Sequence, residues 1–189
     1  MNRTKRRFSG PRAISAALAA LLLIPAFVGS TSAGVASAGG QADLAAVRQA
    51  TTKYHDLNVA NAAGYGLFYI CTDNEALGAA MGQHFADVSR VVNPTINALD
   101  PEVLVYEPTR NGGYKLVAVE YVVFQADWDA LHASPPELFG RTFEAIGAGN
   151  RYGLPPFYEL HAWIWKGNPR GLFNDWNPNV SCLGNGDPA

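Results

Sequence analysis

The stretch VLVYEPTRNGGYKLVAVEYVVF, residues 103–124, indicates the fold class. Its two runs rich in valine and tyrosine, Val103–Glu107 and Tyr114–Phe124, have the composition of β-strands. Arg110–Gly113 separates the two runs, and an Asn-Gly pair is typical of the type I′ turn that joins antiparallel strands. The sequence therefore predicts a β-hairpin whose side chains alternate between two faces.

Working outward, a third strand is predicted at Phe157–Trp165, where aromatic and aliphatic residues dominate. Apolar residues recur every three or four positions over Gln41–Ala62, which indicates an amphipathic helix. Tyr65–Asp100 is rich in glycine, asparagine and small residues, so we expect irregular structure there, with a possible short helix at Phe85–Val92. An N-terminal helix followed by a small antiparallel sheet with long loops is an α+β fold, and a partly closed β-barrel is also compatible.

Residues 1–38 have the order of a secretory signal peptide. Basic residues open the chain, an apolar run covers Ala13–Val28, and small residues then lead to Ala38. We expect cleavage after Ala38 or, as second choice, after Ala33. A membrane anchor is less favoured, because the apolar run is short and Pro25 interrupts it. Arg6 and Arg7 leave open whether export follows the Sec route or the twin-arginine route.

Residues 39–189 are expected to form a single secreted domain with an excess of acidic groups. Five of the 14 basic residues precede Gly39, which leaves nine against all 16 acidic residues. This balance argues against a nucleic-acid partner, because such binding relies on Lys and Arg to neutralise phosphates. We expect no stable membrane association after cleavage, and the oligomeric state stays open.

Cys71 and Cys182 are the only cysteines of the chain. An even number of cysteines in an exported protein predicts one disulfide bond. Two metal thiolates or two free thiols are the alternatives. The chain has no C-x-x-C spacing, which makes the metal alternative less favoured than the bridge.

Ionisable residues interrupt the apolar strands. Strict alternation in Phe157–Trp165 puts Glu159 and His161 on one face, where ligands two residues apart can converge on one ion. Glu120 is the one acid of its strand, and a two-residue hairpin turn would put Glu107 on the same face, an inference that a three-residue loop would break. A carboxylate inside an apolar strand is destabilising unless it is solvated, paired or bound to a metal.

The sequence therefore predicts a metal site made of His84, Glu120, Glu159 and His161, with the first imidazole supplied by the irregular stretch. This mixed nitrogen and oxygen set suits a divalent metal, Zn, Mn, Fe or Cu, and does not distinguish among them. Glu107 is the candidate catalytic residue, as a general base or as a partner of a ligand. An apolar pocket for a small-molecule substrate or ligand is predicted from three aromatic residues, Tyr121, Trp163 and Trp165.

Other interpretations of these residues stay open. Glu120 can face solvent on a half-exposed sheet. His161 can pair with Glu159 or with a backbone carbonyl, and Arg141 or Arg151 can neutralise one of the acids. In each case the strand pattern would be explained without a metal ion.

Four motifs are spaced along the exported portion: MGxH at residues 81–84, VEY at 119–121, YELHxWxW at 158–165 and WNPxVSC at 176–182. With these motifs the chain resembles a family of small secreted bacterial proteins of unknown function. The resemblance implies export, and it transfers no catalytic role to any residue.

Two functional hypotheses follow. In the first, the chain is a secreted metal-dependent enzyme that acts on a small extracellular substrate by hydrolysis, isomerisation or oxygen chemistry. In the second, it is a non-catalytic secreted protein that binds a small molecule, a sugar or a metal. Several common chemistries are not indicated, because the sequence lacks a G-x-S-x-G elbow, a G-x-G-x-x-G turn, a P-loop and an H-E-x-x-H motif.

Overall fold

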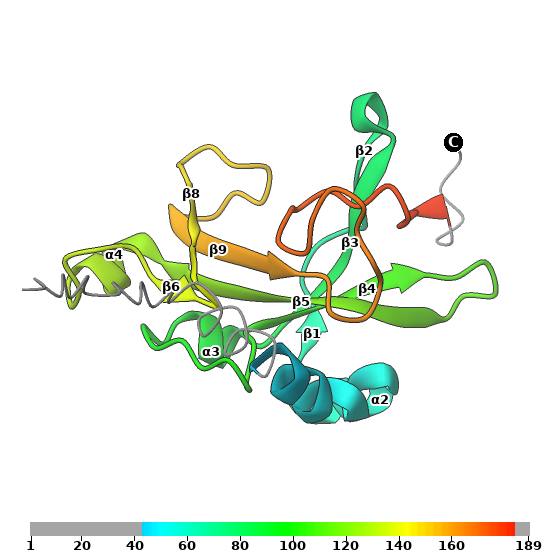
Figure 1. Cartoon of the computed structure of the whole chain (residues 1–189), viewed down its shortest axis with the longest axis horizontal. Coiled ribbons are helices and arrows are strands. Elements are labelled where there is room, and N and C mark those ends of the chain that lie inside the picture. The colour runs from blue at the N-terminus through cyan, green and yellow to red at the C-terminus, as the bar shows by residue number, and fades with distance from the viewer. Residues whose placement is uncertain (1–42, 184–189) are drawn as a thin grey trace, which may run out of the picture. The chain divides into compact units, whose positions relative to one another are not determined.

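One open antiparallel sheet carries most of the regular structure of the described residues (Figure 1). The computed structural model describes residues 43–183, so the predicted signal peptide, residues 1–38, lies outside the described residues. Within residues 43–183, seven strands pair in the order β1-β3-β4-β5-β9-β8, with β2 also paired to β3. The predicted α+β class with an antiparallel sheet is consistent with this arrangement, whereas the alternative of a partly closed barrel is not what forms.

The strands of the sheet are β1 (Gly66–Leu67), β2 (Thr72–Asn74), β3 (Ala79–Ala86), β4 (Val103–Pro108), β5 (Tyr114–Phe124), β8 (Glu144–Ile146) and β9 (Phe157–Ala162). A separate two-stranded ribbon consists of β6 (Glu137–Leu138) and β7 (Arg141–Thr142). The short helices are η1 (Thr52–His55), α2 (Leu57–Ala62), η2 (Glu75–Leu77), α3 (Val88–Val91) and α4 (Gln125–Asp129). No helix within the described residues is both long enough and apolar enough to cross a membrane.

The predicted hairpin is confirmed as β4 and β5, but the predicted turn type is wrong. The Thr109 N–H donates to the Gly113 carbonyl over 2.8 Å, so the loop has three residues, 110–112. A type I′ turn needs a positive φ at both central residues. Gly112 has a φ of 77°, whereas Asn111 is not among the non-glycine residues with positive φ.

A three-residue loop alone would turn Glu107 away from the face of Glu120. The register of β4 against β5 shifts between Val105 and Tyr106, where Val117 is the extra residue of a β-bulge. The bulge reverses the effect of the loop. Glu107 and Glu120 therefore share a face, for a reason that the sequence did not reveal.

Both faces of the sheet are covered by apolar packing. The helix face is the side of Leu104 and Val119, on which residues from the N-terminal helical part, Val47, Tyr54 and Ala60, are buried. The tail face is the side of Val103 and Val122, on which Trp163, Val180 and Cys182 from the C-terminal segment are buried. Figure 1 shows α2 on one side of β5 and the orange and red C-terminal segment on the other.

The helical part before the sheet is divided rather than continuous. Residues 43–51 are helical, η1 follows, and α2 starts after Asp56. Asp56 has extended backbone angles, and its side chain accepts a hydrogen bond from the Asn58 N–H, so it caps α2. The predicted start of a helix at Gln41 lies outside the described residues.

The stretch predicted to be irregular contains a long strand of the sheet, β3. All eight residues of Ala79–Ala86 are buried, and β3 pairs with β1, β2 and β4. Alanine and glycine have low β-propensity, so burial on both faces decides this strand rather than local preference. The short helix predicted at Phe85–Val92 is reduced to the four residues of α3.

The third predicted strand is shorter than expected, because β9 ends at Ala162. The Trp163 N–H donates to the Leu172 carbonyl, and the Trp165 N–H donates to the Val117 carbonyl, so the backbone leaves strand geometry. Alternation stops there. Trp163 consequently packs on the tail face, whereas Trp165 packs with the residues of the helix face.

A backbone pair and a disulfide bond help to hold the C-terminal segment to the sheet. Asn177, fully buried, exchanges two backbone hydrogen bonds with Ala80 of β3, at 3.2 and 3.0 Å. Cys182 forms a disulfide bond with Cys71, with the two Cα atoms 5.5 Å apart, as the cysteine count predicted. Two residues of the WNPxVSC motif, Asn177 and Cys182, therefore attach the C-terminal segment to the rest of the fold.

Candidate metal centre

Three strands bring the predicted imidazoles and carboxylates to the tail face. Glu120 of β5 lies directly opposite His161 of β9, and Val122 lies opposite Glu159. Glu159 is therefore the diagonal neighbour of Glu120 on the same face. His84 reaches the group from β3, across the valine side chains of β4. Each residue of the predicted site is thus placed by sheet register rather than by a flexible loop.

Three of the four predicted ligands come together closely enough to hold one ion. Ligand atoms of His84, Glu120 and His161 all lie within 4.8 Å of one another, and all three side chains are buried. The His84 Nε2 atom lies 3.5 Å from Glu120 Oε2, and the two imidazole ring centroids are 6.2 Å apart. Two ligand atoms that bind the same ion at about 2.1 Å are separated by roughly 3–3.5 Å, so small side-chain adjustments suffice.

The two imidazoles have no hydrogen-bond partner of normal geometry. This holds for both ring nitrogens of His84 and both of His161, although the two residues are 3% and 1% exposed. A buried polar atom without a partner costs about 1–3 kcal/mol. Four such atoms at one point of a well-packed sheet are unusual in a native protein, and a bound ion would satisfy one nitrogen of each ring.

Burial keeps both imidazoles neutral. Desolvation lowers the pKa of His84 to about 4. The pKa of His161 also lies well below its usual value, because the ring is buried and His84 is close by. Neutral imidazole is the form that binds a metal, so the site has the protonation state that coordination requires.

The carboxyl groups are crowded in the same way. Burial, followed by the proximity of Glu159, raises the pKa of Glu120 well above its usual value. Burial raises the pKa of Glu159 to about 7, and that of Asp175, which lies nearby, to about 6. Glu120 and Glu159 interact with each other, and a proton held between them avoids two adjacent buried negative charges. A cation would take the place of this proton, because metal ligands bind in the deprotonated form.

A cavity of about 120 Å³ opens beside the group. His84, Glu120 and Glu159 line it, and most of its other lining residues are apolar. Trp163 stacks on His161 with the ring centroids 4.5 Å apart, and the Trp163 indole N–H donates to the Asn174 carbonyl. An ion bound here could therefore be reached from the cavity.

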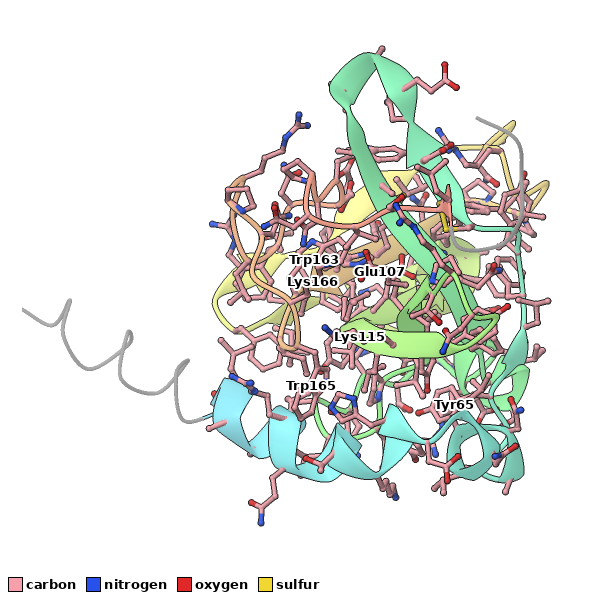
Figure 2. All side chains as sticks on the ribbon, turned by 90° about the vertical axis from the view of Figure 1, so that its right-hand side faces the viewer. Tyr65, Glu107, Lys115, Trp163, Trp165 and Lys166 are labelled. Carbon is pink, nitrogen blue, oxygen red and sulfur yellow. A yellow bond between two sulfur atoms is a disulfide. The ribbon has the colours of Figure 1, made fainter. Side chains whose placement is uncertain are left out.

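Glu107, the predicted catalytic residue, is not brought to this group. Its carboxylate accepts a hydrogen bond from Lys166 Nζ at 2.6 Å and one from the Ser181 N–H at 3.1 Å. It shares the tail face with Glu120 but lies near the far end of β4. Figure 2 shows Glu107 beside Lys166, and the contacts are those of a residue that fixes the tail to the sheet.

The predicted aromatic pocket is also divided by the sheet. Tyr121 is fully buried on the helix face, where its hydroxyl donates to the Ala98 carbonyl. Trp165 packs against His55, with ring centroids 4.4 Å apart, and Figure 2 shows it close to the N-terminal helical residues. Of the three aromatic residues, Trp163 alone contacts the candidate metal ligands.

Sequence reasoning missed two neighbours of the site. Asp175 lies in the turn-rich tail, and its proximity raises the pKa of Glu120 and Glu159. Tyr152 lies in the loop before β9, with its ring 6.4 Å from His84. Neither residue lies in a periodic segment, so hydrophobic patterning carried no signal for them. Their positions follow from the path of two long loops.

Comparisons of the chain with protein-family models, with curated proteins and with solved structures found no match. The resemblance to small secreted bacterial proteins therefore stays a prediction.

Proposed function

We propose that the chain binds one divalent transition-metal ion through His84, Glu120 and His161, and that it acts as a metal-dependent enzyme on a small molecule. The observation that carries this proposal is the convergence of a buried carboxyl group with two buried imidazoles, whose ring nitrogens make no hydrogen bond of normal geometry. Two imidazoles and one carboxylate form a ligand set used by catalytic zinc and by non-haem iron.

The number of ligands supports catalysis over a closed structural site. Structural zinc sites have four protein ligands, whereas catalytic sites keep a coordination position for water or substrate. Here the described residues supply three ligands, and two of them, His84 and Glu120, line the adjacent cavity. The open position of the ion would face that cavity.

Glu159 is the residue that we assign to proton handling, in place of Glu107. It contacts Glu120 and lines the cavity, but it is not part of the three-residue ligand group. With Glu120 bound to an ion, Glu159 would be the carboxylate in the cavity lining that is left free of the metal. It could then accept a proton from a water or substrate in the cavity. Hydrolysis, isomerisation and oxygen chemistry all use such a pair of metal and carboxylate.

A non-catalytic metal-binding protein is the second candidate. The observation that favours it is the burial of all three ligands, since enclosed ions exchange slowly. A turnover assay on the metal-loaded protein separates the two candidates, because storage or scavenging predicts stoichiometric metal without catalysis.

We also propose that this activity is extracellular. The Cys71–Cys182 disulfide supports this, because such bonds persist in oxidising compartments. The acidic balance of residues 39–189 agrees with a small-molecule partner rather than with nucleic acid.

Elemental analysis of the purified, disulfide-bonded protein tests the metal site. We expect about one equivalent of a transition metal in the wild type and in a control variant, Glu107→Gln. Glu107 suits a control because its carboxylate pairs with Lys166 and not with the metal ligands. His161→Gln keeps the approximate side-chain volume and should lose the metal. A chelator should lower the melting temperature of the wild type and not that of His161→Gln.

Two results would contradict the site. One is metal-free wild-type protein that gains no stability from added Zn, Mn, Fe or Cu. The other is equal loss of metal in Glu107→Gln and His161→Gln, because this would show general damage rather than removal of a ligand.

A further inference from the structure

The cavity beside the ligands is polar at one end and apolar at the other. On β5, the residues that line it are Glu120, Val122 and Phe124, which follow one another on the same face. On β9, Glu159 and Phe157 line it in the same order, and Phe124 lies opposite Phe157. The change from carboxyl groups to phenyl rings thus runs along both strands, over roughly 13 Å of backbone on β5 and roughly 7 Å on β9.

The entrance of the cavity is apolar as well. Val88 of α3 is 64% exposed and Val92 is 54% exposed, and both line the cavity. Phe68, 38% exposed, lines it from the segment after β1, where its N–H donates to the His84 carbonyl. The buried lining residues include the ionisable ones, so a molecule that enters meets apolar side chains first and ionisable groups last.

The chemistry of the lining excludes several ligand classes. Within the described residues, no lysine, arginine or amide side chain lines the cavity. A phosphate or a polycarboxylate would find no cationic side chain there. A sugar would leave most of its hydroxyl groups unpaired. Among the described lining residues Tyr152 alone has a hydroxyl group, and that group contacts Met81 Sδ at 3.8 Å.

The volume sets the size of the occupant. The cavity measures about 120 Å³. An apolar protein cavity of about 150 Å³ holds one benzene molecule. The occupant therefore has an apolar body close to the size of a single aromatic ring or of a chain of five or six carbon atoms.

We propose that the site takes a small, mostly apolar molecule with a single oxygen-bearing head group, such as a short aliphatic alcohol or a phenol. The apolar body lies between Phe124, Phe157 and Val88, and the oxygen points to His84 and Glu120. The inference deepens the proposed function, on which it rests for the position of the head group. The cavity that binds the apolar part of the ligand is formed by protein side chains alone and does not depend on the metal ion.

A homologous series of primary alcohols, from ethanol to octanol, tests the proposal by NMR titration of the full-length purified protein. Each buried methylene contributes about 0.8 kcal/mol, so we expect the affinity to rise about fourfold per carbon up to about six carbons and then to stop rising. 1,6-Hexanediol should bind at least tenfold more weakly than 1-hexanol, because its second hydroxyl would be buried without a partner.

Two variants locate the binding site. Phe124→Ala lengthens the cavity at its apolar end, opposite Phe157, and should extend the rise in affinity to alcohols longer than hexanol while leaving ethanol nearly unchanged. Val88→Asp puts a charge at the exposed entrance, where folding is not at stake, and should weaken hexanol severalfold. Val59→Asp is the matched control, since Val59 is an exposed valine of α2 away from the cavity.

The outcomes separate this inference from the proposed function. Bound metal together with an affinity that does not depend on chain length, or with tighter binding of hexanediol or glucose than of hexanol, overturns the inference and leaves the metal site standing. A chain-length dependence in a protein that binds no metal keeps the apolar cavity and overturns the metal site.

Discussion

The buried and half-buried carboxyl groups on the sheet differ in the partners that each one has. Glu107 has a lysine, and Glu102 accepts a hydrogen bond from the Val122 N–H at 3.1 Å. Glu120 has a second carboxyl group, Glu159, and neutral imidazoles. A lysine or an N–H favours the ionised form of a carboxyl group, whereas a second acid nearby opposes ionisation. The difference explains why Glu120 is a candidate ligand and the other two are not.

Glu102 gives a prediction on pH and stability. It is 2% exposed, and burial raises its pKa to about 7, although the Val122 N–H and Arg90 act in the opposite direction. The folded state therefore holds the proton more tightly than the unfolded chain, where the pKa is near 4.5. The stability that this proton contributes is complete below about pH 4.5 and is lost as the pH rises through 7.

Glu102→Gln keeps the hydrogen-bond acceptor and stays neutral at every pH. We expect the variant to match the wild type in urea unfolding at pH 4.5 and to exceed it by about 2–3 kcal/mol at pH 8. Measurements at three pH values between these limits give the dependence of the unfolding free energy on pH for each protein. If the unfolding free energies of the two proteins differ by the same amount at pH 4.5 and at pH 8, the raised pKa of Glu102 is contradicted.

At the scale of single residues, part of the site could be predicted from the strand pattern. Glu120, Glu159 and His161 stand out because ionisable residues are costly in apolar strands. The place of Glu107 could not be predicted, because its partner Lys166 follows β9 after alternation has ended. The neighbours contributed by loops have no periodicity that would reveal them.

Among the elements, β3 depends most on a special backbone position. Gly82 has a φ of 107°, and a Cβ atom there would lie 2.8 Å from the Tyr106 carbonyl oxygen. It stands opposite Thr72 of β2, where the register is irregular, and the pairing with β4 starts at the next residue, Gln83. Glycine at this point allows β3 to pair with both neighbours and to place His84 at the site.

Gly82→Ala should therefore destabilise the protein by roughly 2–4 kcal/mol, through an unfavourable φ and a clash with backbone. Gly66→Ala is the matched control, because Gly66 lies in β1 with no heavy atom within 4 Å of the added Cβ and without a positive φ. Urea unfolding of the two variants measures the effect. Equal stabilities of Gly82→Ala and Gly66→Ala would show that the bend in β3 does not need glycine.

The elements differ in how far local sequence determines them. The β4–β5 hairpin has valine and tyrosine in a strand pattern and a turn sequence, so it could be predicted almost to its bounds. β3 consists largely of small residues and could not be predicted, because its burial between neighbouring strands is a tertiary effect. β9 ends early because a hydrogen bond to the tail, from Trp163 to Leu172, replaces a ladder bond.

At the scale of the whole molecule, as far as residues 43–183 describe it, different parts of the chain cover the two faces of the sheet. The helix face is covered by residues close to the start of the described chain, and the tail face by residues at its end. The tail carries little regular structure, so its position depends on point attachments. These are the backbone pair of Asn177 with Ala80, the Lys166–Glu107 ion pair and the disulfide bond.

The disulfide is expected to be the strongest of these attachments. It joins residues 111 positions apart, and for a loop of this length the chain-entropy model gives about 4–5 kcal/mol. Replacing both Cys71 and Cys182 with serine should therefore lower the melting temperature by roughly 10–20 °C. Because the tail packs on the face that holds His84 and Glu120, the double variant should also lose metal at a lower temperature than the wild type.

Differential scanning calorimetry of the oxidised wild type, the reduced wild type and the double serine variant measures this contribution. The reduced protein and the double variant should melt together, well below the oxidised protein. If all three melt at the same temperature, the tail is held by its packing and hydrogen bonds alone. If only the double variant melts early, the bridge is shielded from the reductant by the packing around Cys182, which is 8% exposed.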